Sequence, residues 1–195
     1  MTARLDTERL IIRPLQLTDS SAVYDYRSNP EVVRYQMWRP ESESDVRQFI
    51  REQLGLTPGM PGIWYQFGLV RKADNELIGD CGIHIPLEHT EAAELGMTLA
   101  QTSQRLGYAT EAIVALLDYC FTSLGLLSVL ARTEKRNMRS IALIRRMDFY
   151  PARAENFGLA EEEDELLFVM ERPDWERRKA AQGRHPSPGG LFLNS

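Results

Sequence analysis

The stretch Gln-Arg-Leu-Gly-Tyr-Ala-Thr-Glu, residues 104–111, is a polar, glycine-containing segment that lies between two apolar segments. Upstream, residues 94–99 have the length and apolarity of a short strand. Downstream, apolar residues recur from Ala112 to Leu124 at the spacing of one buried helix face. A strand that enters a helix through a glycine-containing turn directs free backbone N–H groups and the positive helix end at one point. The pattern therefore predicts an anion site, best suited to phosphate or pyrophosphate.

Two common phosphate-binding loops are absent from this stretch. Neither Gly-x-x-x-x-Gly-Lys-Ser/Thr nor Gly-x-Gly-x-x-Gly occurs there, and the motif present is Gln-x-x-Gly-x-Ala. In that motif Gly107 would let a ligand approach the backbone, and the small side chain of Ala109 would avoid crowding the ligand. An ordinary strand-to-helix turn without a ligand is the alternative interpretation.

The composition indicates a single water-soluble domain with a negative net charge. The chain has 195 residues, 43% of them hydrophobic, and a formal net charge of −5, which argues against a broad nucleic-acid-binding surface. No apolar run reaches the ~18 residues needed to span a membrane, and residues 1–20 carry charges among their apolar positions, unlike a signal peptide. Cys81 and Cys120 lack metal-binding spacing. We therefore expect two buried, reduced thiols and no metal site in a cytoplasmic protein that contacts neither nucleic acid nor membrane.

Hydrophobic periodicity and turn residues predict the order of strands and helices. The expected elements are a strand over 7–17, a helix after Thr18, a helix over 44–54, strands over 63–70, 76–85 and 93–99, a helix over 110–124, a strand over 127–133, a helix from Asn137 to about Met147, and a final strand pair within 148–171. From Glu176 onward the apolar period is lost. We therefore expect a single domain over residues 1–175 and a flexible tail over residues 176–195.

This order of elements resembles the fold of the GNAT acyltransferases, and Gln-x-x-Gly-x-Ala resembles their acyl-CoA pyrophosphate loop. Residues 7–14, 77–84 and 107–112 and the motif Asn137-x-x-Ser140 are similar to the branch that contains the ribosomal-protein alanine acetyltransferases. The resemblance covers about residues 5–175. It implies a mixed α/β (α+β) GNAT fold, in which about four helices flank a central, mixed, mostly antiparallel sheet. It also implies an enzyme, an acetyl-CoA-dependent N-acetyltransferase.

The chain departs from that family's pattern in three places. Asp148 precedes Phe149 where the branch usually has Gly-Phe, although an aspartate also tolerates the left-handed geometry of a helix end. Ile144 stands about where many GNAT enzymes carry a tyrosine that protonates the leaving thiolate, so that role does not transfer. Ala152 stands about where some ribosomal-protein acetyltransferases carry a glutamate base. These changes put the family's usual acid and base in doubt here.

Three residues are candidates for the chemistry. Glu94 begins the strand before the loop, near the place where some GNAT enzymes keep a general base, and a solvated strand-end carboxylate is the alternative. His84, on the preceding strand, is the second candidate base because its unperturbed pKa lies near neutrality, and a hydrogen-bonded core histidine is the alternative. Ser140 corresponds to a serine that lies near the CoA sulfur in the resembling branch, or it is an ordinary first-turn serine with Asn137 as the cap.

The resemblance also implies which residues bind the acetyl-CoA. They are Met97, Leu99, Gln104, Arg105, Leu106, Gly107, Tyr108, Ala109, Thr110, Asn137, Arg139 and Ser140. Six cations crowd residues 132–146, and of these Arg136 and Arg139 are the candidates for the 3′-phosphate, with a solvated helix face as the alternative.

Tyr35, Trp38 and Trp64 are the candidates for the acceptor pocket, and core packing is the alternative for Trp64. The acceptor implied is an amine on a small molecule or a protein N-terminus. A non-catalytic acyl-CoA-binding or sensing module of the same fold is the competing function. A homodimer is compatible with the sequence, which specifies neither the acyl chain length nor the oligomeric state.

Overall fold

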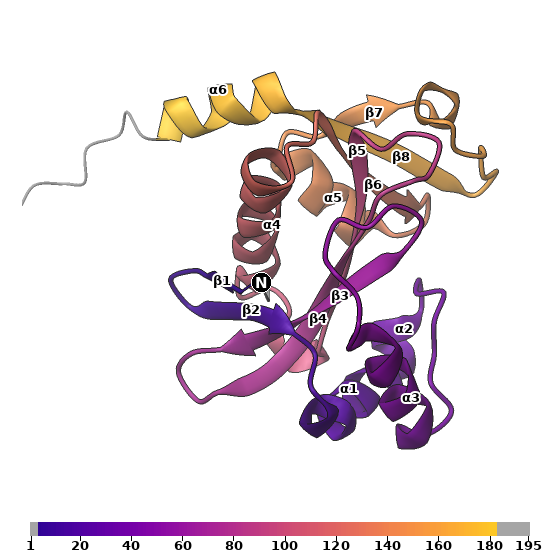
Figure 1. The fold of residues 1–195 in the computed structure, drawn as a ribbon, viewed down its shortest axis with the longest axis vertical. Helices are drawn as coiled ribbons and strands as arrows, with labels where there is room; N and C mark the ends of the chain where they lie inside the picture. Colours follow the sequence, from indigo (N-terminus) through magenta and orange to yellow (C-terminus); the bar gives the residue numbers. More distant parts are fainter. Residues whose placement is uncertain (1–3, 183–195) are drawn as a thin grey trace, which may run out of the picture.

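The structure is a computed structural model that describes residues 4–182 (Figure 1). Within this range eight strands form one sheet in the order β1-β2-β3-β4-β5-β6-β8-β7. The strands are β1 (Leu5–Asp6), β2 (Leu10–Pro14), β3 (Trp64–Arg71), β4 (Glu76–His84), β5 (Ala92–Leu99), β6 (Ser128–Glu134), β7 (Tyr150–Ala152) and β8 (Glu165–Glu171). Neighbouring strands are antiparallel except β5 and β6, which are parallel. The sheet is therefore mixed and mostly antiparallel, as the sequence predicted.

Six α-helices cover the sheet within the described range, two more than expected. They are α1 (Ser20–Arg27), α2 (Pro30–Val33), α3 (Glu43–Gln53), α4 (Tyr108–Asp118), α5 (Met138–Arg146) and α6 (Arg172–Gln182). Pro30 occupies the first turn of α2, whose N-cap Asn29 accepts a hydrogen bond from the Glu31 N–H. A π-helical turn, Tyr119–Ser123, continues α4 until Gly125, whose φ of 72° suits a helix end.

The helices divide between the two faces of the sheet. Apolar residues of α4 and α5 pack on one face in the main core, which also contains Cys81 and Cys120. Apolar residues of α1 and α3 pack on the other face in a second cluster, and Figure 1 shows α1, α2 and α3 gathered on the side away from α4. Within residues 4–182 no helix is both long and apolar enough to cross a membrane.

The parallel strands β5 and β6 run together for only half of their length. Residues 92–95 of β5 pair with residues 128–131 of β6, and beyond Leu95 and Ala131 the two strands part. The remainder of β5 pairs only with β4, and the remainder of β6 pairs only with β8. Helix α4 follows the free end of β5 and α5 follows the free end of β6. Ligands of open sheets with parallel strands bind outside such carboxyl ends.

The C-terminal boundary expected from the sequence is wrong for residues 176–182, because these belong to α6. Figure 1 shows α6 lying across the end of α4. Trp175 is buried against Phe121, and its Nε1 donates to Asp118 at 3.2 Å. One buried aromatic residue and a few ion pairs attach this helix to the rest of the domain. Its sequence therefore shows no apolar period from which the helix could be predicted. The expected tail over residues 183–195 lies outside the described residues.

Candidate active site

The loop before α4 presents an array of free backbone donors. Arg105 and Gly107 both have left-handed backbones, with φ of 64° and 86°. Gly107 is the N-cap of α4 and provides no side-chain cap. Among residues 4–182, no acceptor is found for the backbone N–H groups of residues 105–110. Unpaired donors at a helix N-terminus next to left-handed residues form a concave anion site, so the geometry supports the pyrophosphate loop predicted from the sequence.

Two backbone carbonyls near this loop are occupied by side-chain amides. Gln104 Nε2 donates to the carbonyl of Leu99 at 3.1 Å, which ties the loop to the end of β5. Gln36 donates from its side-chain amide to the carbonyl of Met97 at 3.4 Å, a contact not predicted from the sequence. No pattern around Gln36 marks it, because the loop after α2 reaches β5 only in the folded chain. Met97 and Leu99, both predicted to contact the donor, thus lie on the part of β5 that no longer pairs with β6.

Helix α5 begins after the part of β6 that no longer pairs with β5. Asn137 caps α5 by accepting a hydrogen bond from the Ser140 N–H at 3.1 Å. Within the described chain the Asn137 amide nitrogen and the Ser140 hydroxyl have no hydrogen-bond partner, so both are available to a ligand. The capping role and the ligand role expected for Asn137 are therefore compatible.

The cations of α5 are placed differently from the sequence-based prediction for the 3′-phosphate. Arg146, at the end of α5, donates to the hydroxyl of Thr110 in the first turn of α4 at 3.2 Å. Arg136 lies before the other end of α5, where its carbonyl accepts a hydrogen bond from Tyr35 at 3.4 Å. Arg139 lies in the first turn of α5, roughly 10 Å from Arg146 along the helix axis at 1.5 Å per residue. Arg146, and Arg105 within the loop itself, therefore lie nearer the loop than the start of α5 does, and the assignment of Arg136 or Arg139 to the 3′-phosphate stays a prediction.

The two candidate bases lie side by side. His84 of β4 is the register partner of Glu94 of β5, so both side chains project from the same face of the sheet. Their neighbours Ile83 and Ala93 belong to the core beneath α4, so His84 and Glu94 project from the opposite face. Glu94 lies one residue before Leu95, the last residue of β5 that pairs with β6. The carboxylate therefore stands where the two parallel strands part.

Burial shifts the pKa values of both candidate bases, in opposite directions. It raises the pKa of Glu94, an effect partly offset by Arg132, whose Nε lies 3.8 Å from Glu94 Oε1, and enhanced by Glu165. A carboxylate with a raised pKa is a stronger base. Burial lowers the pKa of His84 despite an opposing effect of Glu88, so the imidazole is neutral at pH 7. Burial thus makes Glu94 a stronger base and keeps His84 in the neutral form that can accept a proton.

Trp64 extends this row across a third strand. It is the register partner of His84, and the two rings stack with centroids 5.3 Å apart. Its indole lies over the paired glycines Gly82 and Gly96, since a Cβ atom on Gly96 would be 3.4 Å from the ring. The side chain is 39% exposed. Trp64, His84 and Glu94 thus lie in one row on the same face of the sheet, and the indole covers the two glycines. This placement is consistent with an acceptor site.

The other two acceptor candidates lie apart from this row. Trp38 packs on Phe49 with ring centroids 4.6 Å apart and on the guanidinium of Arg27 at 5.0 Å, so it belongs to the helical layer that covers the sheet. Tyr35 reaches the loop before α5 through its hydrogen bond to the Arg136 carbonyl. No group of His, Cys, Asp or Glu side chains in residues 4–182 has the arrangement of a metal site.

The chain matches a known protein family. Residues 9–150 match the acetyltransferase (GNAT) domain family, and the chain belongs to it. The chain is 34% identical over 146 residues to an uncharacterised N-acetyltransferase, p20, from Bacillus licheniformis, over 74% of this chain and 81% of that protein. It is 32% identical over 146 residues to another, YoaA from Bacillus subtilis (strain 168), with the same coverage. The expected GNAT membership and N-acetyltransferase class are confirmed.

Solved structures show the same architecture. A GNAT-family acetyltransferase from Bacillus anthracis superposes with a TM-score of 0.72 at 25% identity, over 87% of this chain and 98% of that one. A structure described as that of a ribosomal-protein-serine acetyltransferase from Vibrio cholerae gives a TM-score of 0.71 at 24% identity, over 88% and 99% of the two chains. The mixed α/β GNAT fold predicted from the sequence is therefore confirmed.

Proposed function

We propose that this N-acetyltransferase takes its acetyl group from acetyl-CoA and transfers it directly to a primary amine. The observation that carries the proposal is the position of Glu94, which stands where β5 and β6 part; the loop with the free N–H groups of residues 105–110 follows β5, and α5 follows β6. Bound acetyl-CoA supplies an acyl thioester, whose carbonyl carbon an amine can attack. The loop would hold its pyrophosphate, and Asn137 would hold the pantetheine amides.

In this proposal Glu94 is the general base. It accepts the proton that the attacking amine nitrogen loses as the new amide bond forms, directly or through a water molecule. Its raised pKa and its position beside neutral His84 support this role, and His84 is the alternative base. Ser140 donates a hydrogen bond to the sulfur as the carbon–sulfur bond breaks, since its hydroxyl has no partner within residues 4–182. Direct transfer needs no acyl-enzyme, and the sequence shows no Ser-His-Asp arrangement that would form one.

A non-catalytic acyl-CoA-binding module is the second candidate. The specific observation in its favour is the burial of Ile144 in the core, at about the position where the family resemblance implies an acid. The chain would then bind the donor without turnover.

The experiment that tests the proposal is an acceptor screen that follows release of free CoA with a thiol reagent. The acceptors should include peptide N-termini, amino acids, polyamines and amine antibiotics, each with and without protein. We expect an acceptor-dependent release of thiol that Glu94→Gln suppresses. Tight CoA binding without thiol release from any of these amines would establish the binding module instead.

A further inference from the structure

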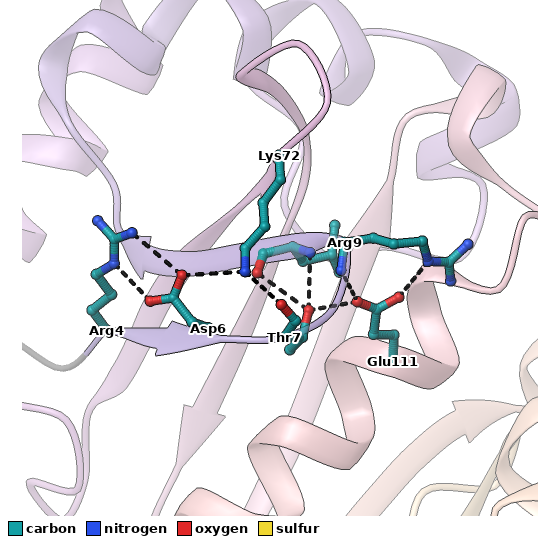
Figure 2. Close-up of polar contacts among 7 residues, drawn as sticks. Arg4, Asp6, Thr7, Arg9, Lys72 and Glu111 are labelled. Atoms are coloured by element: carbon teal, nitrogen blue, oxygen red, sulfur yellow. Dashed lines mark hydrogen bonds and ion pairs between the residues drawn. The ribbon is translucent and has the colours of Figure 1, made fainter. Parts of the chain in front are cut away.

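The turn between β1 and β2 holds the start of α4 through one carboxylate, as Figure 2 shows. Glu111, in the first turn of α4, accepts hydrogen bonds from the Thr7 hydroxyl at 2.5 Å and from the Arg9 backbone N–H at 2.7 Å. Its other oxygen accepts from Arg9 Nε at 2.7 Å. Burial raises the pKa of Glu111, but these hydrogen bonds outweigh burial and lower the pKa overall, so the carboxylate is ionised at neutral pH.

Arg9 joins this carboxylate to the backbone of the loop. Its Nη1 donates to the carbonyl of Leu106 at 3.0 Å. Its guanidinium also lies over the ring of Tyr108, 4.6 Å from the centroid. A single side chain thus contacts the loop, the first residue of α4 and Glu111. If Arg9 served only to attach the β1–β2 turn to α4, its contact with Glu111 would be sufficient. The additional hydrogen bond to the Leu106 carbonyl indicates a role in the loop itself.

The contact with Leu106 determines the direction of a donor in the loop. In a trans peptide the C=O and the following N–H point in opposite directions. A Leu106 carbonyl directed at Arg9 therefore turns the Gly107 N–H away from Arg9, to the side where the N–H groups of residues 105–110 have no acceptor within the described chain. Gly107 also needs to lack a side chain, because a Cβ atom there would lie 3.2 Å from Arg9 Nη2 at a φ of 86°.

We propose that Arg9, held in place by Glu111 and Thr7, is a positioning residue for the donor, because it fixes the peptide between Leu106 and Gly107 with its N–H toward the pyrophosphate. This inference rests on the proposed use of acetyl-CoA. Arg9 does not contact the reacting atoms. By fixing this peptide before the donor binds, Arg9 lowers the entropy that the loop loses on binding, and such preorganisation increases affinity for the donor.

The test compares two arginine-to-methionine variants that differ only in their contact with the loop. Arg9→Met keeps an apolar stem over Tyr108 and the backbone hydrogen bond to Glu111, but it loses the side-chain hydrogen bonds to Glu111 and Leu106. Arg4→Met makes the same charge change on the adjacent segment, where the Arg4 side chain is 57% exposed and pairs only with Asp6 at 2.9 Å within residues 4–182 (Figure 2). Calorimetry with CoA should show about tenfold weaker binding for Arg9→Met, the effect of losing a hydrogen bond to a charged group, and unchanged binding for Arg4→Met.

A truncated donor separates positioning from general stability. S-acetyl-N-acetylcysteamine carries the same thioester but no pyrophosphate, so kcat/KM with this donor should be equal in Arg9→Met and the wild type. With acetyl-CoA, Arg9→Met should raise KM and leave kcat nearly unchanged. If Arg9→Met is unstable, Arg9→Lys replaces it: a lysine keeps the charge but cannot contact Glu111 and Leu106 in the fork geometry of arginine, so it should also weaken CoA binding.

Two results would overturn the inference, and they are distinguishable. If the wild type binds CoA and a folded Arg9→Met protein binds it equally well, or loses rate equally with both donors, Arg9 has only a structural role. If the wild type itself does not bind CoA, the proposed function fails and this inference fails with it.

Discussion

The buried ion pair between Arg27 of α1 and Asp80 of β4 permits a quantitative prediction. Arg27 donates from Nε to Asp80 Oδ2 at 2.9 Å and from Nη2 to Oδ1 at 2.5 Å. The two side chains are only 8% and 1% exposed. Tyr26 and Gln66 also donate to the Asp80 carboxylate, at 2.6 Å and 2.5 Å. Asp80 lies on the same face of β4 as His84, so this network fixes α1 over the face that carries the candidate bases.

Arg27→Met should destabilise the protein strongly, because it leaves the buried carboxylate of Asp80 without its cation. Removing one partner of a buried pair costs about 3–5 kcal/mol. We expect the lower limit, about 3 kcal/mol, since methionine fills most of the space and two hydrogen bonds to Asp80 remain. For a domain of this size that loss corresponds to a melting temperature lower by roughly 6–12 °C.

The assay is thermal and denaturant unfolding of Arg27→Met beside Arg71→Met. Arg71 pairs with Asp74 at 2.6 Å and also with Glu76, but these two carboxylates are 46% and 57% exposed, so loss of both pairs should cost only about 1 kcal/mol. The double variant Arg27→Met/Asp80→Asn should be more stable than Arg27→Met, because it removes the unpaired charge. Equal stability of Arg27→Met and Arg71→Met would refute the burial argument. In the folded fraction, Arg27→Met should raise KM for the amine and leave CoA affinity unchanged.

Three further predictions concern the base, the loop and the C-terminal helix. Glu94→Gln should slow the chemical step by about 10²–10⁴ and remove the lower-pH limb of the rate profile with normal CoA affinity; full rate with an unchanged limb would place the base elsewhere. Because burial raises the folded-state pKa of Glu94, stability from this group falls as pH rises through that pKa, so Glu94→Gln should raise the melting temperature at pH 7 and lose this advantage below about pH 4. Gly107→Val should weaken CoA strongly in a folded protein, as calorimetry would show, whereas unchanged affinity would contradict the loop assignment. Truncation after Trp175 should lower the melting temperature by several degrees, because it removes the ion pairs of Arg178 with Asp148, just after α5, and of Lys179 with Asp118 of α4; an unchanged value would show that these pairs contribute nothing.

Local features of the chain were sufficient to predict the loop and the helix starts. The glycine in residues 104–111, the apolar period that follows it and the Asn137 cap act within a few residues of each other, so the sequence alone records them. The same holds for the alternation of strands and helices, from which the GNAT resemblance was drawn. Helix α6 was missed because its stability comes from Trp175 and ion pairs with distant residues rather than from a period of its own.

Tertiary structure alone decided which of the predicted residues meet. Trp64, His84 and Glu94 lie on three strands, and only the register of those strands makes them a row. Trp38 packs in the helical layer against Phe49 and Arg27. Arg146 lies beside the loop because α5 brings its last turn, not its first, to Thr110. Arg9 and Glu111 are separated by 102 positions, yet they bond directly. Pairings at such separations depend on strand register and helix crossing, which arise from packing of the whole chain, so no local pattern encodes them.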